Sequence, residues 1–422
     1  MQNRAAAGQM PRQVWVLAAV ALVVALGFGV VVPAIPLFAS EYGVGRTAVG
    51  LAISTFAFFR LVSALASGSV VDRIGERTVM VGGLVLVSVS TFAAAFAPGF
   101  ASFVALRGVG GIGSAGFTVA AVSLLLRVAP SEQRGRATSL WQGGFLLGGV
   151  AGPAVGGPLT DVDPQLPFFV YSVGLMVAGA VALVGLRRLP DDGARGQRPA
   201  ETAEVSVADP DAPAPTVTPD RAALLSALRH PAYLAALVAN IGVGWMLFGV
   251  RNSLVPLYVV EDIGRSATWA GAGFLVGSVA QGVALLRAGH VADLRGRRPA
   301  MIMGSAVCTA SVALLALPPG LVLFLVSMAG FGLGAAFLAS APSAVVGDLS
   351  PGGSGKLVAV FQMAADTGAV IGPLAAGWLS DTYSPRVAFG ATAAVLLLGL
   401  FAALRMPETR GGRPIRAAAG PS

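Results

Sequence analysis

The sequence is short of charged residues. Only 11% of its 422 residues are Asp, Glu, Lys or Arg, whereas soluble domains carry about 25%. Hydrophobic residues make up 55%, and the mean hydropathy is +0.78. A chain of this composition cannot cover soluble domains with polar surface, so that class is excluded. The net charge of +8 is not gathered on a soluble basic domain, which argues against nucleic-acid binding.

Residues that build metal, covalent and nucleotide chemistry are also scarce. The chain has two histidines and one cysteine, Cys308, so an internal disulfide is excluded. Its sequence contains no pattern typical of a metal site, a catalytic triad or a phosphate-binding loop. We therefore predict neither an enzyme nor a cofactor, and we predict that ATP is not the direct energy source.

Long apolar runs are abundant. A bilayer core of about 30 Å needs about 20 apolar residues per helix, and helices satisfy their own backbone groups in lipid. Twelve runs of suitable length follow one another, near residues 14–38, 47–70, 79–97, 101–128, 138–160, 167–186, 232–259, 268–291, 300–317, 321–346, 357–379 and 387–405. We expect an all-α membrane protein with twelve transmembrane helices.

The basic residues predict the orientation of this bundle, because cytoplasmic loops are enriched in Lys and Arg. With the N-terminus in the cytoplasm, 22 of the 28 basic residues fall on the cytoplasmic side. Only Arg46, Arg265 and Arg386 fall on the other side, and three more lie inside predicted spans. We expect both termini in the cytoplasm and the chain in the inner or plasma membrane.

A polar segment divides the spans into two sets of six. It contains "DDGARGQRPAETAEVSVADPDAPAPTVTPD", which is rich in Pro, Ala and Asp and has no apolar periodicity. Such a composition is typical of a disordered linker. The predicted organisation is a six-helix bundle at 1–186, a cytoplasmic linker at 187–231, a second bundle at 232–405 and a cytoplasmic tail at 406–422.

The two halves repeat a loop sequence. "GSVVDRIGERTVMV" follows the second predicted helix, and "GHVADLRGRRPAMI" follows the eighth. Glycines permit a tight turn there, and an aspartate can accept hydrogen bonds from the N-terminus of another helix. We predict a cytoplasmic gate motif that comprises Gly68, Asp72, Arg73, Gly75, Arg77, Gly289, Asp293, Gly296 and Arg298.

A longer repeat lies in the fifth and eleventh helices. "RATSLWQGGFLLGGVAGPAVGGPLTD" aligns without a gap with "KLVAVFQMAADTGAVIGPLAAGWLSD", and Asp161 meets Asp381 at the end of the alignment. Glycines allow close helix packing, and proline bends a helix. The predicted gating-helix motif comprises Gly148, Gly152, Pro153, Gly156, Gly157, Gly372 and Pro373. Internal repeats in a polytopic chain predict a transporter with its site between the halves, near the midplane.

These residues resemble the major facilitator superfamily, and within it the twelve-span drug:proton antiporters. The loop motif, "LRGVGGIGSAG" around Arg107, and "GGVAGPAVGG" carry the resemblance. The third motif is associated with exporters. The resemblance implies that the loop cluster latches the halves together on the cytoplasmic side and that Arg107 lies on the cavity wall, linked to proton relay. Two departures are Glu76, in place of a usual basic residue, and a first helix without an acid.

Four charged residues fall inside predicted spans: Arg60, Arg107, Arg251 and Asp366. A charge near the bilayer centre costs at least about 2.5–3.5 kcal/mol, so each must face a partner or a wet cavity. Asp366 lies about 15 Å deep, counted from Lys356 at about 1.5 Å per residue. We predict that Asp366 and Arg107 serve proton coupling, with Arg107, Arg251 or water beside the acid. The alternative is a structural partner for a buried arginine.

Polar residues recur at matching depths in the two halves. Arg60 corresponds to Gln281, and Gln142 corresponds to Gln362. We predict that these four and Arg251 line the substrate cavity, although some could instead bond between helices. Arg251 lies in the outer half of its span, where it could attract acidic substrate groups or extend to the interface.

These expectations combine into one function. The sequence predicts a monomeric secondary transporter that exports a small organic molecule, drug or metabolite, in exchange for protons, by alternating access across the lipid bilayer. One alternative is a proton-coupled importer of a metabolite. Another is a non-transporting membrane sensor, which would be distinguished by an appended soluble domain.

Overall fold

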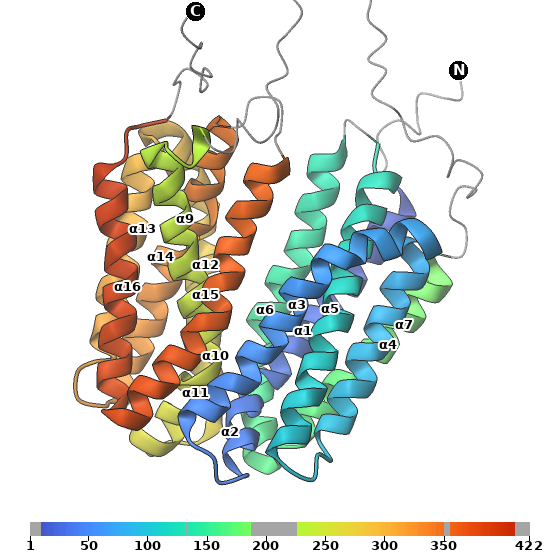
Figure 1. The fold of residues 1–422 in the computed structure, drawn as a ribbon, viewed down its shortest axis with the longest axis horizontal. Coiled ribbons are helices and arrows are strands. Elements are labelled where there is room, and N and C mark those ends of the chain that lie inside the picture. Colours follow the sequence, from blue (N-terminus) through green and yellow to red (C-terminus); the bar gives the residue numbers. More distant parts are fainter. Residues whose placement is uncertain (1–9, 131–132, 187–225, 350–354, 410–422) are drawn as a thin grey trace, which may run out of the picture.

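The computed structural model describes residues 10–130, 133–186, 226–349 and 355–409. Within these ranges every regular element is helical and no strand occurs (Figure 1). The predicted all-α class is therefore confirmed. The predicted linker at 187–231 lies largely outside the described residues, as does the predicted tail at 406–422.

The first half forms a bundle of long helices. Its elements are α1 (Arg12–Val31), α2 (Ala34–Ser40), α3 (Arg46–Ile74), α4 (Glu76–Ala94), α5 (Phe100–Val128), α6 (Arg134–Val162) and α7 (Leu166–Gly185). The run predicted as one helix at 14–38 is divided into α1 and α2. Pro33 stands at the break, because proline cannot donate the backbone hydrogen bond that would continue the helix.

The second half repeats this arrangement with one irregular member. Its elements are α9 (Pro231–Val243), η3 (Gly244–Val250), α10 (Arg251–Ser253), α11 (Val255–Leu257), η4 (Tyr258–Asp262), α12 (Ala267–Arg295), α13 (Arg297–Leu314), α14 (Leu321–Leu349), α15 (Gly355–Thr382) and α16 (Pro385–Arg405). The run predicted as one helix at 232–259 contains two π-helical segments, η3 and η4. Segments of this kind occur frequently at functional sites.

All twelve predicted runs are helical in the structure. In the described ranges, ten helices are long and apolar enough to cross a membrane. The other two are α6, whose hydropathy is lowered by Gln142, glycines and prolines, and α13, which begins with Arg297 and Arg298. That all twelve cross the bilayer, and that both termini are cytoplasmic, stay predictions.

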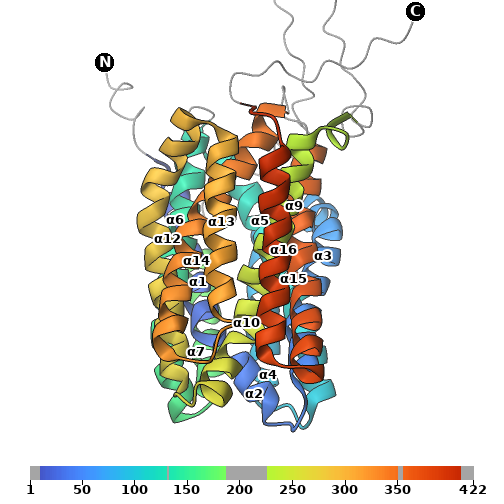
Figure 2. The same cartoon turned by 90° about the vertical axis from the view of Figure 1, so that its left-hand side faces the viewer.

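The two bundles meet at one end and diverge toward the other (Figure 1). We call the end at which α3 and α12 begin and α6 and α15 end the closed end. The opposite end, where α1 begins and α16 ends, is called the open end. In the described part of the chain, every hydrogen bond that joins the two halves lies in the closed-end half of the molecule. Figure 2 shows the second half from its outer side, with α2 of the first half at the closed end.

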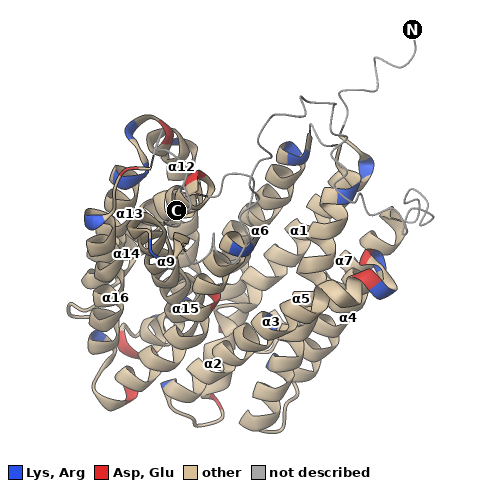
Figure 3. Ribbon diagram, turned by 45° about the horizontal axis from the view of Figure 1, so that its top comes forward, with Lys and Arg blue, Asp and Glu red and all other residues tan. Residues whose placement is uncertain are grey.

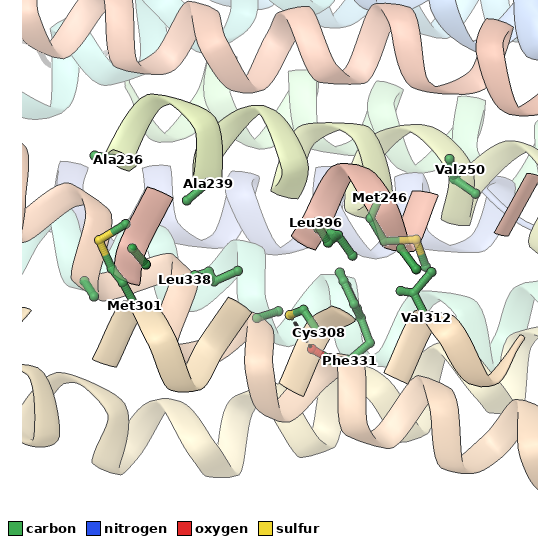
Figure 4. Close-up of a cluster of buried hydrophobic side chains, with 14 of the residues drawn as sticks. Ala236, Ala239, Met246, Val250, Met301, Cys308, Val312, Phe331, Leu338 and Leu396 are labelled. Carbon is green, nitrogen blue, oxygen red and sulfur yellow. Dashed lines mark hydrogen bonds between the residues drawn. The ribbon is translucent and has the colours of Figure 1, made fainter. Parts of the chain in front are cut away.

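Each half has a hydrophobic core drawn almost wholly from its own helices. Figure 4 shows part of the core of the second half, where the Cys308 thiol lies 3.7 Å from the carbonyl oxygen of Phe331. Glycines bring helices close within each half: Gly148 and Gly156 of α6 face the backbone of α1, and Gly368 of α15 faces η3 and the end of α9. The gating-helix glycines therefore serve mainly packing inside a half, as small residues do in membrane helices.

Candidate functional site

Two aspartates close one end of the space between the halves. At the end of α6, Asp161 accepts hydrogen bonds from the backbone N–H groups of Ala267 (2.7 Å) and Thr268 (3.0 Å) and from the Thr268 hydroxyl. These groups begin α12, in the other half. An anionic acceptor at a helix N-terminus satisfies otherwise unpaired N–H groups and the positive end of the helix dipole.

The repeat supplies the same contact on the other side. At the end of α15, Asp381 accepts from the backbone N–H groups of Arg46 (2.9 Å) and Thr47 (2.8 Å) and from the Thr47 hydroxyl (2.6 Å). These groups begin α3. Each half therefore caps a helix of the other, and the two contacts are related by the same pseudo-two-fold symmetry as the repeats.

Glycine contacts lie one helical turn from each cap, on the side of the open end. A Cβ atom added to Gly50 of α3 would collide with the carbonyl oxygen of Pro373 in α15, and one added to Gly271 of α12 would collide with that of Pro153 in α6. Ser54 Oγ donates to the carbonyl oxygen of Val370 at 2.6 Å. We call these contact surfaces the α3–α15 seam and the α6–α12 seam. Both depend on backbone-to-backbone approach.

The α3–α15 seam has an additional ionic cluster. The Arg46 guanidinium lies 2.6 Å from Glu261 and 2.8 Å from Asp262, both in η4, and donates to Ser380 Oγ at 2.9 Å. Ala267 begins α12 in the corresponding place, so the α6–α12 seam has no such guanidinium. The two seams are therefore alike in their caps and unlike in their charge.

Above the seams, toward the open end, an acid and a base face the same space. Asp366 of α15 is half-buried and Arg60 of α3 is exposed. The charge of Arg60 acts on Asp366, although no ion pair within 4.0 Å joins them. The predicted neighbours of Asp366 were Arg107, Arg251 or water. The structure places Arg60 there, nearly two turns of α3 beyond the Ser54 contact.

Arg107 lies behind this pair, in the wall of the first half. It is 6% exposed, its guanidinium carbon lies 4.6 Å from the centre of the Phe56 ring, and its Nε is buried without a hydrogen-bond partner. The charges of Arg107 and Arg60 both act on Tyr171. Arg107 and Arg60 thus belong to one neighbourhood, and a cation over an aromatic face is stabilised by the ring quadrupole.

Arg251 occupies a similar environment in the second half. Its guanidinium carbon lies 4.5 Å from the centre of the Phe274 ring, and its Nη2 donates to the Phe274 carbonyl oxygen (3.2 Å) and to Ser278 Oγ (3.4 Å). Arg251 and Gln281 line a small cavity of about 10 Å³ together with Leu247, Gly277, Met328, Phe331 and Gly332. That volume suits about one water molecule.

Two predicted cavity residues, Gln142 and Gln362, lie further toward the open end, where both are exposed on α6 and α15. Gln281 is half-buried in α12, beside Arg251. The structure therefore brings Arg60 and Asp366 together, and Arg251 with Gln281, but gives no direct contact among the three glutamines.

The predicted gate motif forms two similar turns at the open end. Gly75 and Gly296 have φ of +86° and +108°, which favours glycine. Arg77 donates to the carbonyl oxygen of Leu183, and Arg298 donates to that of Leu404, both at 2.7 Å. Each arginine thereby ties its turn to the last helix of its own half.

The aspartates of the gate motif do not bridge the halves here. Asp293 pairs with Arg297 at 3.0 Å, and Arg297 also pairs with Asp348 at 3.0 Å, all within the second half. Glu76, the departure from the family pattern, lies 3.4 Å from Arg127. Among the residues that the structure describes at the open end, no hydrogen bond or ion pair of the gate-motif aspartates therefore joins the two halves.

The closed-end contacts are the functional feature that sequence reasoning missed. The alignment of Asp161 with Asp381 was a visible signal, but alignment alone does not say which groups a carboxylate accepts from. A second signal was that Gly50 and Gly271 are separated by 221 residues, the same separation as Asp72 and Asp293 of the loop repeat. No signal in the sequence indicated the role of Arg46, because arginines are common just outside membrane spans.

Comparison with known proteins assigns the chain to a family. The family model of the Major Facilitator Superfamily matches residues 17–277 and 245–421. The chain belongs to this superfamily, which confirms the resemblance. It is accordingly a multi-pass membrane transporter of the plasma or inner membrane, and not an enzyme.

Two relatives are bacterial resistance proteins. The chain is 30% identical over 173 residues to the quinolone resistance protein NorA of Staphylococcus aureus (strain MRSA252), and 29% identical over 162 residues to multidrug resistance protein 1 of Bacillus subtilis (strain 168). The matches span 40% and 38% of this chain, and 43% and 42% of those relatives.

Solved structures show the same fold. A bacterial homologue of the human lysosomal transporter Spinster, inward-facing and unoccupied, superimposes with a TM-score of 0.75 at 16% identity, covering 94% of this chain and 97% of that chain. The occupied form gives a TM-score of 0.72 at 15% identity. At these identities the likeness describes the fold alone.

Proposed function

We propose that the protein exports small organic molecules in exchange for protons, by alternating access, with the open end in the cytoplasm. The observation that carries this proposal is the arrangement of the halves: capped together at one end, apart at the other, with an acid and a base at the apex of the space between them. The efflux relatives support export as the direction.

Asp366 is proposed as the proton carrier. Among the acids of the described helices it is the one placed furthest from either end of its helix, and Arg60 of the adjoining helix α3 is a charged neighbour. The ionised form is favoured by that arginine and by water, and is disfavoured by a dry, closed surrounding. Opening the cavity to one side and then to the other changes both conditions, so the carboxyl group can take up and release a proton in step with transport.

The closed-end caps are proposed as the barrier that must break when the cavity opens outward. A helix cap contributes about 0.5–2 kcal/mol. Two such caps amount to a barrier that substrate or proton binding can overcome, because a few kcal/mol of differential affinity shifts a two-state equilibrium. The gate motif around Asp72 is proposed to latch the open end after that change.

Transport in proteoliposomes tests the proposal. The test compounds are norfloxacin, a quinolone as in the name of one relative, and ethidium, a lipophilic cation of a different class. We expect a pH gradient, acidic on the side that corresponds to the cell exterior, to drive at least one of the two compounds toward that side. Asp366→Asn should abolish the gradient dependence. Asp163→Asn, which alters an exposed acid after α6, should not.

Two results would contradict the proposal. Uptake driven in the same direction as the proton gradient would identify the importer instead. Unchanged gradient-driven transport in the Asp366→Asn variant would remove that residue from proton coupling.

A further inference from the structure

The four charged residues deep within the spans are mostly positive. Three are arginines and one is an acid, while most other charges gather near the helix ends (Figure 3). Arginine stays protonated in proteins. A substrate that enters the space between the two halves is therefore exposed to a net positive charge, with a single carboxylate nearby.

The Arg60–Asp366 pair is open to a ligand. Neither side chain has a hydrogen bond or an ion pair in the described part of the chain, and none of their polar atoms is among those buried without a partner. Helices α3 and α15 pack against each other in opposite directions and touch at Ser54 and Val370, so Arg60, six residues beyond Ser54, and Asp366, four residues before Val370, both lie toward the open end from that contact. No ion pair within 4.0 Å joins them. Both groups therefore present unused hydrogen-bonding capacity to accessible space, with a gap between them.

The elements around α15 bring few other charges toward Asp366. Helix α3, which packs on α15, carries Arg60. Segment η3 also packs on α15, and Arg251 is the residue directly after it. Helix α9 brings Tyr233, whose hydroxyl donates to the Leu357 carbonyl oxygen, and the charges of α16 lie at its ends, at Arg386 and Arg405. Proton exchange at this site therefore involves Asp366 against a background set by the arginines.

We propose that the transported molecule is amphoteric, with a cationic amine that binds Asp366 and a carboxylate that binds Arg60. This inference rests on the proposed proton exchange. Guanidinium and carboxylate form strong bidentate hydrogen bonds. The field of Arg107 and Arg251 adds to the attraction of the acidic end. The apolar part of the ligand packs on the aromatic and apolar wall between them.

Amphoteric substrates differ from simple anions and simple cations in how their binding is coupled to the proton on Asp366. An amine and a proton compete for Asp366, so binding of an amine releases a proton, as exchange requires. A simple anion behaves oppositely: protonation of Asp366 frees Arg60 for it, so proton and anion bind together and move together. A simple cation competes with the proton, but it leaves Arg60 unpaired and is repelled by three arginines.

Matched triplets of compounds test the proposal on the purified full-length protein. The first set is 4-(piperazin-1-yl)benzoic acid, its methyl ester and its N-acetyl derivative. The second is phenylalanine with the same two modifications. Binding is measured by calorimetry, and proton release by a pH indicator in weakly buffered solution. We expect at least one amphoteric parent to bind about tenfold more tightly than both of its single-charge derivatives, with release of a proton.

Variants assign the two ends of the ligand. Asp366→Asn should weaken binding of the parent and its ester, strengthen binding of the anionic N-acetyl derivative and abolish proton release. Arg60→Gln should weaken the parent and the N-acetyl derivative and spare the ester, and Arg60→Lys should restore part of the loss. Arg405→Gln, at the exposed end of α16, is the control. A merely structural role for either residue would not give this reciprocal pattern.

The outcomes separate this inference from the proposed function. If neither parent binds more tightly than its derivatives, or neither binds at all, the amphoteric class is wrong, even where a pH gradient drives ethidium export. If the parents bind with the reciprocal pattern but no compound moves with the gradient, the class stands and proton-driven export is wrong.

Discussion

Removing a closed-end cap should shift the protein toward an outward-open conformation. Asp161 and Asp381 each accept from two backbone N–H groups and one hydroxyl of the other half. Asparagine keeps one carbonyl oxygen but loses the charge and the second acceptor. We therefore take about 1 kcal/mol per seam, within the range for helix caps. That is about a fivefold change in the closed-to-open ratio, and about 30-fold for the double variant if the seams are independent.

Ser54 provides the reporter for this change. It is 2% exposed within the α3–α15 seam, so Ser54→Cys should react with a membrane-impermeant thiol reagent only when the closed end opens. The native Cys308 is replaced by serine to clear the background. We expect faster labelling in Asp161→Asn and Asp381→Asn, and still faster in the double variant. Asp163→Asn is the matched control, since Asp163 accepts only from its near neighbour Gln165. Equal rates in all variants would refute the role of the caps.

Three other perturbations have definite expected results. Gly271→Ala sets a methyl group against the carbonyl oxygen of Pro153, so the same labelling assay should report opening, whereas Gly149→Ala, with no atom nearby, should not; equal labelling would contradict the close-approach argument. Arg46→Gln removes two ion pairs to η4, and hydrogen exchange in η4 should rise several-fold while α12 is unaffected; unchanged exchange would show that the pairs are dispensable. Burial lowers the pKa of His230, whose Nδ1 accepts from the N–H of the second residue of α9, so this cap is present above the ordinary pKa of about 6.5 and is lost as pH falls. Protection of the first turn of α9, corrected for intrinsic exchange, should decrease on acidification in the native protein but not in His230→Asn, where the amide caps at every pH.

The helices could be predicted from the sequence because each depends on local composition. Apolar length marked all twelve runs, and the repeats marked the two halves. The π-helical segment around Gly244 could not be predicted, since its apolar residues suit an ordinary helix equally well. It is associated with Gly244 lying against the backbone of Ala365 in α15, a contact between distant parts of the chain.

The sequence could predict which charged residues belong to the candidate site, but it could not predict which of them lie next to each other. Asp366 was identifiable because an acid inside an apolar run is costly and therefore has a reason to be there. Its neighbour depends on how α3 and α15 cross, which the spacing of residues within each helix does not determine. The sequence left Arg107, Arg251 or water as the neighbour of the acid, and the crossing of the two helices places Arg60 near it instead.

The exchange of caps makes each half incomplete without the other. Helix α3 begins on an aspartate of the second half, and α12 begins on an aspartate of the first. Reciprocal contacts of this kind define the isologous interface of a symmetric dimer. The closed end thus has the geometry of a two-fold dimer interface formed within one chain. The ion pairs of Arg46 with Glu261 and Asp262 are where that symmetry breaks.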